Sequence, residues 1–137
     1  MGLQARKVFC AWLVLDGVIW DIIIGGMLPA VAAKQLEMVA SENTIVDPVT
    51  VRHVGYGMLL HGTLRAAAGF NLDNSTLARL AATSYMIENW MWVSEWLNGT
   101  VREWFIPFAL TVNSLWCVIL LHYISRNRDN VKGCHAN

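Results

Sequence analysis

Four long apolar blocks of about 20 residues each dominate this chain and limit what it can fold into, because a helix needs about that length to cross the ~30 Å hydrocarbon layer of a membrane. The blocks cover residues 8–27, 51–70, 77–97 and 104–124. Only 15% of the residues are charged, against about 25% in an ordinary soluble domain. We therefore expect an all-α polytopic membrane protein: a single domain over residues 1–137 with four transmembrane helices in a bundle and a polar C-terminal tail, 125–137.

Two segments outside this plain pattern need interpretation. The first block follows Arg6 and Lys7 as the core of a signal peptide would, but Asp16 and Asp21 interrupt its apolar run, so we interpret it as a retained span. Residues 30–47 mix charged and apolar side chains, which predicts a short amphipathic helix on the membrane surface.

An even number of spans places both chain termini on one side of the membrane. Cytoplasmic loops carry an excess of lysine and arginine, and the terminal side has more of them than the opposite side. This bias favours termini in the cytoplasm. The terminal side holds Arg6, Lys7, Arg79, Arg126, Arg128 and Lys132, and the opposite side holds Lys34, Arg52 and Arg102.

Charge and motif content exclude several classes of function. Ten basic and ten acidic side chains leave a formal net charge of zero, so the chain lacks the basic field that nucleic-acid binding needs. The cysteines, Cys10, Cys117 and Cys134, are widely separated. The sequence has no metal-ligand spacing, phosphate loop, dinucleotide fingerprint or catalytic triad. We expect no metal, no cofactor and no catalytic residue.

Ionisable residues inside the predicted spans are the first candidates for a site, because each costs at least a few kcal/mol in lipid unless it is paired. At about 1.5 Å rise per residue, Arg65 lies within reach of the depths of Asp16 and Glu88, which predicts that it pairs with one or both. Asp21 is a further ionisable group without an assigned partner. Structural pairing between helices is the favoured interpretation. The alternative is a proton relay or acid–base site that uses His61 with Glu88.

Glycines in the second block predict a close helix contact. Gly55, Gly62 and Gly69 recur every seven positions, so they form one stripe on a helix. Small residues in such a stripe let a neighbouring helix approach closely in a membrane.

Tryptophans gather where the third block ends and the fourth begins. Tryptophan is enriched at membrane–water boundaries and at protein interfaces, so this cluster marks one face of the bilayer and a candidate binding surface. The predicted partner-binding residues are Trp90, Trp92, Ser94, Glu95, Trp96 and Trp104.

Short motifs along nearly the whole chain occur in a recognisable order. They are Ala11-Trp12-Leu13, Arg52, Gly55, Arg65, Asn74-x-Thr76-Leu77, Ser94-Glu95, Gly99-Thr100, Pro107 and Tyr123. This order resembles that of the ergosterol biosynthetic protein 28 family, small four-span proteins of the endoplasmic reticulum.

The resemblance implies a non-catalytic scaffold that tethers the membrane enzymes of sterol C-4 demethylation: a methyl oxidase, a decarboxylating dehydrogenase and a ketoreductase. Its partners would be these proteins and lipids, in the endoplasmic reticulum. Two alternatives stay open. One is an accessory subunit of a respiratory or photosynthetic complex in the mitochondrial inner or thylakoid membrane. The other is a small membrane enzyme that acts on a sterol or lipid in a cavity lined by His61, Glu88 and Asp16.

Overall fold

The computed structural model describes the backbone of residues 3–134 and the side chains of residues 4–125, and this part of the chain is all-α. The first helix is α-helical at its start and π-helical after that, and a short helix follows before three long ones. The elements are α1 (Leu3–Val14), the π-helix η1 (Leu15–Met27), α2 (Pro29–Val39), α3 (Pro48–Phe70), α4 (Ser75–Leu97) and α5 (Phe105–Cys134).

Local sequence signals set the helix boundaries. Asp47 caps α3, because its Oδ1 accepts hydrogen bonds from the backbone N–H groups of Val49 at 2.7 Å and Thr50 at 3.1 Å. Asn74 caps α4 in the same way. Pro29 occupies the first turn of α2, where its missing N–H costs nothing, and so the chain turns sharply after η1.

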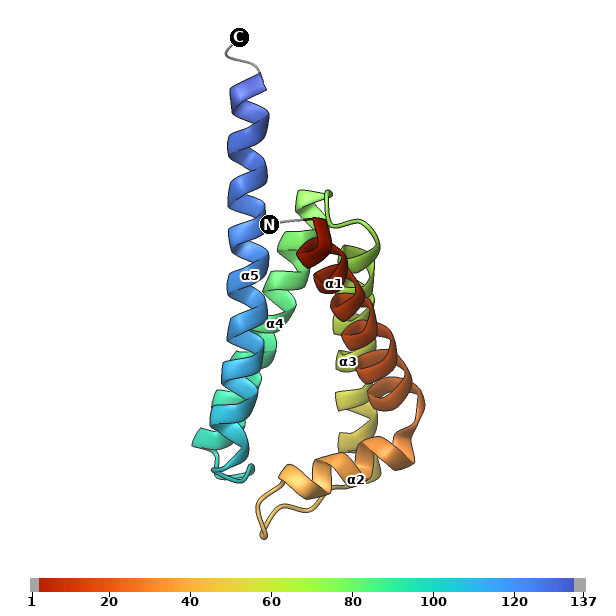
Figure 1. Cartoon of the computed structure of the whole chain (residues 1–137). Coiled ribbons are helices and arrows are strands. Elements are labelled where there is room, and N and C mark those ends of the chain that lie inside the picture. Colours follow the sequence, from red (N-terminus) through yellow and green to blue (C-terminus); the bar gives the residue numbers. More distant parts are fainter. Residues whose placement is uncertain (1–2, 135–137) are drawn as a thin grey trace.

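The helices form two pairs (Figure 1). The rod of α1 and η1 lies against α3, and α4 lies against α5. The two pairs meet at the end that holds the N-terminus and the α3–α4 turn, and they diverge toward the other end, where α2 crosses beneath the first pair. Successive long helices run in opposite directions, as expected for a chain that crosses a membrane repeatedly.

The two pairs are joined at both ends. At the N-terminal end, the buried side chains of Leu13, Tyr85 and Leu120 share one core, and the Trp116 ring stacks on Trp12 with centroids 5.1 Å apart. At the other end, the loop after α2 meets the α4–α5 loop in a short antiparallel bridge at Ala40. We call the contact of residues 39–44 with residues 100–102 the loop contact.

Two helical segments of the described chain are long and apolar enough by themselves to cross a membrane, Gln4–Met27 and Phe105–Ser125, and they correspond to the first and fourth predicted spans. The structure differs from the sequence-based expectations in two other respects. The surface helix expected over residues 30–47 ends at Val39, because the following residues form the loop contact. The predicted polar tail continues α5 to Cys134, since a fall in hydropathy marks the end of an apolar segment but does not end a helix.

Candidate functional site: a buried arginine network

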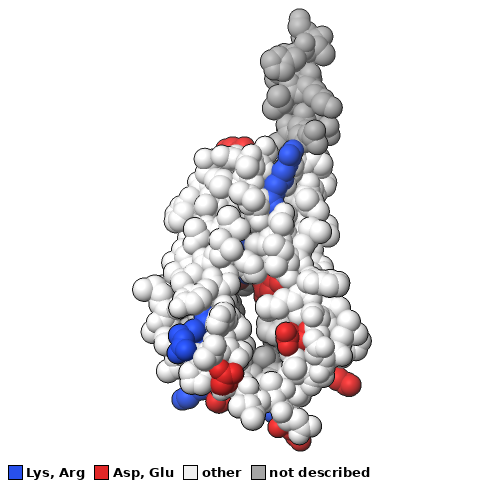
Figure 2. Space-filling view, turned by 180° about the vertical axis from the view of Figure 1, so that it is seen from behind, with Lys and Arg blue, Asp and Glu red and all other residues white. Residues whose placement is uncertain are grey.

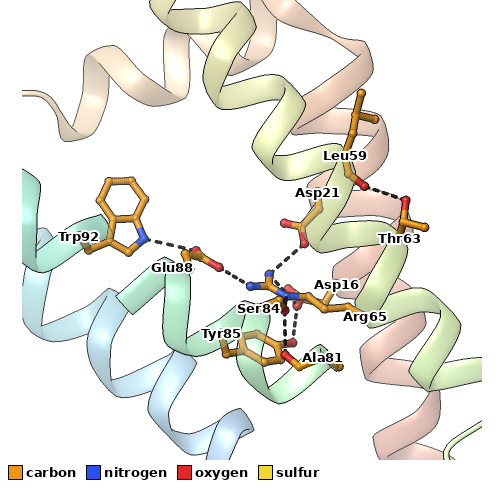
Figure 3. A network of polar contacts seen from close by, with 10 residues as sticks. All are labelled: Asp16, Asp21, Leu59, Thr63, Arg65, Ala81, Ser84, Tyr85, Glu88 and Trp92. Carbon is orange, nitrogen blue, oxygen red and sulfur yellow. Dashed lines mark hydrogen bonds and ion pairs between the residues drawn. The ribbon is translucent and has the colours of Figure 1, made fainter. Parts of the chain in front are cut away.

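Arg65, on α3, is the most deeply buried cation among the described residues, with only 2% of its surface exposed. Its Nη1 donates to Asp21 Oδ2 at 2.9 Å and to Asp16 Oδ2 at 3.4 Å. Its Nη2 donates to a carboxylate oxygen of Glu88. One guanidinium therefore binds three carboxylates that come from two other helices, η1 and α4 (Figure 3).

Two further residues of α4 complete the environment of the guanidinium. Arg65 Nε donates to Ser84 Oγ at 3.2 Å, and the guanidinium carbon lies 3.8 Å from the centre of the Tyr85 ring, a cation–π contact. The Tyr85 hydroxyl donates to Asp16 at 2.5 Å. We call this set the Arg65 network: Asp16, Asp21, Arg65, Ser84, Tyr85 and Glu88.

The backbone of η1 explains how two aspartates reach one arginine. Hydrogen bonds of a π-helix join residues five apart, so Asp16 and Asp21 lie one turn apart on the same face. In an α-helix of 3.6 residues per turn, the same pair would diverge by about 140° around the axis. The π-helical geometry therefore turns both carboxylates toward α3.

Glycines hold η1 and α3 close enough for these bonds. A Cβ atom added to Gly62 would lie 2.5 Å from the carbonyl oxygen of Gly17 and 2.6 Å from the Cβ of Asp21. A Cβ added to Gly17 would in turn lie 2.5 Å from the carbonyl oxygen of Gly62. This close approach is what small residues permit between membrane helices. It places Asp21 directly beside the helix that carries Arg65.

All three glycines of the predicted stripe lie on the side of α3 that meets α1 and η1. Gly62 contacts η1 as described, Gly55 packs near Gly25, and Gly69 packs near Val14 at the end of α1. The stripe thus runs along one continuous helix contact. This contact joins the rod of α1 and η1 to α3.

Glu88 connects the network to α5. Its second carboxylate oxygen accepts a hydrogen bond from Trp92 Nε1 at 3.3 Å, and the Trp92 ring packs edge-on against Phe105. The side chain of Asn113, on α5, lies beside Glu88. The polar contacts therefore extend from η1 to the neighbourhood of α5.

The structure brings together Arg65, Asp16 and Glu88, which the sequence analysis paired, and adds three residues that it did not. Asp21 was recognised as ionisable but had no partner, because residues five apart do not share a face of an α-helix. Ser84 and Tyr85 precede Glu88 by four and three positions, and this spacing on α4 was a usable signal. His61 is half-buried on α3 and makes no hydrogen bond with the described residues.

Three of the six predicted partner-binding residues are exposed, and the other three are partly buried. Trp90, Trp96 and Trp104 are exposed, whereas Trp92 turns inward to Glu88. Glu95 accepts a 2.5 Å hydrogen bond from the Thr100 hydroxyl and so belongs to the end of α4. Ser94 is half-buried on the same turn of helix, so this position also contributes little exposed surface.

The chemistry of the Arg65 network is that of ion pairing. Arginine stays charged in proteins and presents a rigid set of five N–H donors, which suits it to hold several carboxylates at once. Among the described residues, no group of three or more His, Cys, Asp or Glu side chains is arranged to share a metal ion. What the geometry provides is a fixed joint between η1, α3 and α4.

Comparison with known proteins gives one result. The family model described as Erg28 like protein matches residues 22–118, which is more than half of the chain. The match begins within η1, includes all of α2, α3 and α4, and ends within α5. No curated protein and no solved structure gives a significant match.

Proposed function

Because this chain belongs to the Erg28-like family, we propose that it is a non-catalytic membrane scaffold that tethers the enzymes of sterol C-4 demethylation. The family and the two apolar helices make the chain a membrane protein associated with sterol biosynthesis. The family match over residues 22–118 is the observation that carries the proposal. By the resemblance, the tethered enzymes are the methyl oxidase, the decarboxylating dehydrogenase and the ketoreductase of the endoplasmic reticulum.

The Arg65 network supports a structural role. Each nitrogen of the guanidinium is bound to a side chain of the same protein, and the bonds cross from α3 to two other helices. Such bonds fix the helices relative to one another. A scaffold needs this property, because it binds its partners through helix faces whose spacing must not change.

The proposal includes four membrane spans, with both termini in the cytoplasm. The helices α3 and α4 have 23 residues each, about 34 Å at 1.5 Å per residue, which is enough to cross a bilayer. They carry more polar residues than the other two, but Arg65 and Glu88 bind each other, and pairing reduces the cost of charge in lipid. The short helix α2 then lies across one end of the bundle, at the membrane surface.

The binding surface in this proposal is the exposed aromatic group at the end of α4 and the start of α5. Trp90, Trp96 and Trp104 project from the protein, and tryptophan is both a frequent anchor in protein interfaces and a residue of the membrane boundary. An anchor at that boundary can hold the membrane-proximal part of an enzyme without entering its active site.

Affinity purification from native membranes tests the scaffold proposal. We expect the three sterol enzymes to co-purify with the tagged wild-type protein and to be lost when Trp90, Trp96 and Trp104 are all changed to leucine. Trp20→Leu is the matched control, because Trp20 is also exposed but lies on η1. Retention of the enzymes by the triple variant would rule out this surface.

A second measurement separates a scaffold from an enzyme. Protein purified away from all partners should leave 4-methyl sterols unchanged under oxidising and reducing conditions. If it converts a sterol, and His61→Ala abolishes the conversion, then the protein is an enzyme and the scaffold proposal is wrong.

A further inference from the structure

The two helix pairs are joined unequally along their length. Near the N-terminal end, an apolar core, a stack of two tryptophans and the Arg65 network connect them. Between the Arg65 network and the loop contact, no hydrogen bond or ion pair among the described residues crosses from one pair to the other. Figure 2 shows the molecule hollowed between the pairs, so side chains leave part of this space unfilled. The loop contact is therefore the joint that holds the diverging ends together.

The short helix α2 spans the gap between the diverging ends. Its 11 residues are about 16 Å long at about 1.5 Å per residue, and Figure 1 shows it crossing from the end of η1 toward the α4–α5 loop. It packs against η1 and α3 and so belongs to the first pair. In the described part of the chain, its link to the second pair is the loop contact that follows its last turn. The separation of the two pairs at this end thus depends on α2 and on that contact.

Backbone and side-chain hydrogen bonds form the loop contact. The N–H of Ser41 donates to the carbonyl oxygen of Thr100 at 2.9 Å, and the N–H of Arg102 donates to the carbonyl oxygen of Val39 at 2.8 Å. The Arg102 side chain adds a bond from Nε to the carbonyl oxygen of Ala40, also at 2.8 Å. Arg102 therefore holds the contact with both its backbone and its guanidinium.

The end of α4 holds Thr100 in position for this contact. The carbonyl oxygen of Thr100 also accepts a bond from the Thr44 hydroxyl at 3.1 Å. The Thr100 hydroxyl itself lies 2.8 Å from the carbonyl oxygen of Glu95 and 2.5 Å from its carboxylate. Gly99, at φ 70°, turns the chain back toward Glu95 in a conformation that residues with a Cβ rarely adopt. The half of the contact that the α4–α5 loop contributes is therefore built by α4.

The loop contact can break without unfolding the rest of the protein. At the end of the bundle, water competes for each donor and acceptor, so a single hydrogen bond favours the closed contact by only about fivefold. The buried apolar side chains of the contact are those of Ala40 and Val101. The joint at the other end buries a larger cluster that includes Leu13, Tyr85 and Leu120. Regions with few buried apolar contacts open at lower cost than such a core, so the loop contact is the weaker joint.

We infer that the loop contact is a latch that opens and closes in the native protein. When it is closed, α2 and the loop contact fix the distance between the diverging ends of the two helix pairs. When it is open, the α4–α5 pair swings about the core at the N-terminal end, and the hollow between the pairs changes its width. The Arg65 network lies between this core and the latch, so it limits how far the pairs can separate.

The latch also acts on the proposed partner surface. Trp96 and Trp104 are exposed on either side of the loop that carries Thr100. A closed latch fixes this loop, so a partner that binds both tryptophans does not have to order it, and binding costs less free energy. By reciprocity, a bound partner favours the closed latch. This step rests on the proposed function, whereas the opening of the latch does not.

Paired spin labels in the full-length protein, in lipid vesicles, measure the opening without any partner. Labels attached through Met27→Cys and Phe108→Cys report on the diverging end, where both positions are exposed. Labels attached through Val8→Cys and Leu121→Cys report on the joined end in the same way. The native cysteines are first changed to alanine, namely Cys10, Cys117 and Cys134.

Two substitutions weaken the latch. Arg102→Ala removes the side-chain bond, and Ser41→Pro removes a backbone donor while suiting the extended conformation of Ala40 before it, at φ −64° and ψ 145°. We expect the double variant to broaden the distribution of distances at the diverging end and to leave the joined end unchanged. Glu42→Ala with Glu103→Ala is the matched control, because these exposed side chains form no hydrogen bond with the described residues. An unchanged distribution at the diverging end would overturn the inference.

A disulfide measures the closed state independently. The two backbone bonds flank Ala40 and Val101, so this bridge is a non-hydrogen-bonded antiparallel pair, whose Cα atoms lie about 4.5 Å apart. Disulfides join Cα atoms about 4.4–6.8 Å apart, so Ala40→Cys and Val101→Cys should form one. In exchange with glutathione, Ser41→Pro with Arg102→Ala should lower the effective concentration of the two thiols about 25-fold, or about fivefold for each lost bond. An unchanged effective concentration would also overturn the inference.

Co-purification connects the latch to the partners. We expect the sterol enzymes to be lost from the double variant, to return when the disulfide is added and oxidised, and to be lost again on reduction. Equal recovery of the enzymes in the open and closed states would refute the inference and leave the scaffold proposal intact. If the labels and thiols reveal the latch but no sterol enzyme co-purifies with the wild-type protein, the latch stands and the proposed partners are wrong.

Discussion

Replacing Gly62 by alanine tests the close contact between α3 and η1. The added Cβ would lie 2.5 Å from the carbonyl oxygen of Gly17 and 2.6 Å from the Cβ of Asp21. Neither atom can swing aside, because one belongs to the backbone and the other is the first atom of its side chain. The helices must therefore separate by about 0.9 Å before the 2.5 Å contact reaches the 3.4 Å of ordinary van der Waals packing.

The size of the effect follows from three contributions. Overpacking a close contact typically costs about 1–3 kcal/mol, and alanine recovers at most about 1 kcal/mol through its higher helix propensity. The separation also lengthens the 2.9 Å bond between Asp21 and Arg65, and breaking a buried ion pair completely costs about 3–5 kcal/mol. We expect Gly62→Ala to lower the free energy of unfolding by about 2–3 kcal/mol in total.

Gly57→Ala is the matched control on the same helix. No atom lies within 4 Å of the position that its Cβ would take, so this variant should raise the free energy of unfolding by up to about 1 kcal/mol. Both values can be measured by unfolding the protein with dodecyl sulfate in mixed micelles and following tryptophan fluorescence. If the two variants change stability equally and in the same direction, the contact between α3 and η1 is not as close as described.

Three further predictions concern charge and topology. Arg65→Leu should lower the free energy of unfolding by about 3–5 kcal/mol in the same assay. The loss should be smaller when the three carboxylates of the Arg65 network are also changed to amides. Equal losses of unfolding free energy would mean that the charges are not coupled. In sealed vesicles, an impermeant thiol reagent should label Cys134 and a cysteine introduced at Asn98 from opposite sides, and labelling of both from one side would contradict four spans. The hydrogen bond from Arg6 holds the pKa of Asp73 below its ordinary 3.8, so this pair stabilises the fold above about pH 4 and the contribution disappears as the pH falls through the lowered value; Asp73→Asn should remove that part of the acid dependence of the unfolding midpoint.

Much of the fold was predictable because its signals are local. The hydropathy blocks predicted four long helices whose starts lie within five residues of the observed ones. Asp47 and Pro48 are a further local signal, since an N-cap residue followed by proline is typical of the start of a helix such as α3. The end of α5 was not predictable in this way. Its helix continues past Ser125 into a polar sequence, since helix formation depends on backbone geometry and not on contact with lipid.

The glycine stripe illustrates a partial prediction. A period of seven on α3 predicted that some helix approaches closely, and the structure identifies that helix as the rod of α1 and η1. The periodicity does not indicate which helix packs there, because the same small residues would accommodate any neighbouring helix. Only the packed arrangement decides which backbone meets Gly62.

The sequence by itself determined the helical class, the positions of the long helices, the family and the presence of ionisable residues that need partners in lipid. The tertiary structure decided how those residues combine. The π-helical turn places Asp21 on the same face as Asp16, and the packing of η1 and α4 around α3 brings three carboxylates to the single guanidinium of Arg65. Hydropathy depends on neighbours along the chain, whereas the partners of a buried charge depend on which helices meet, and that is settled only when they pack.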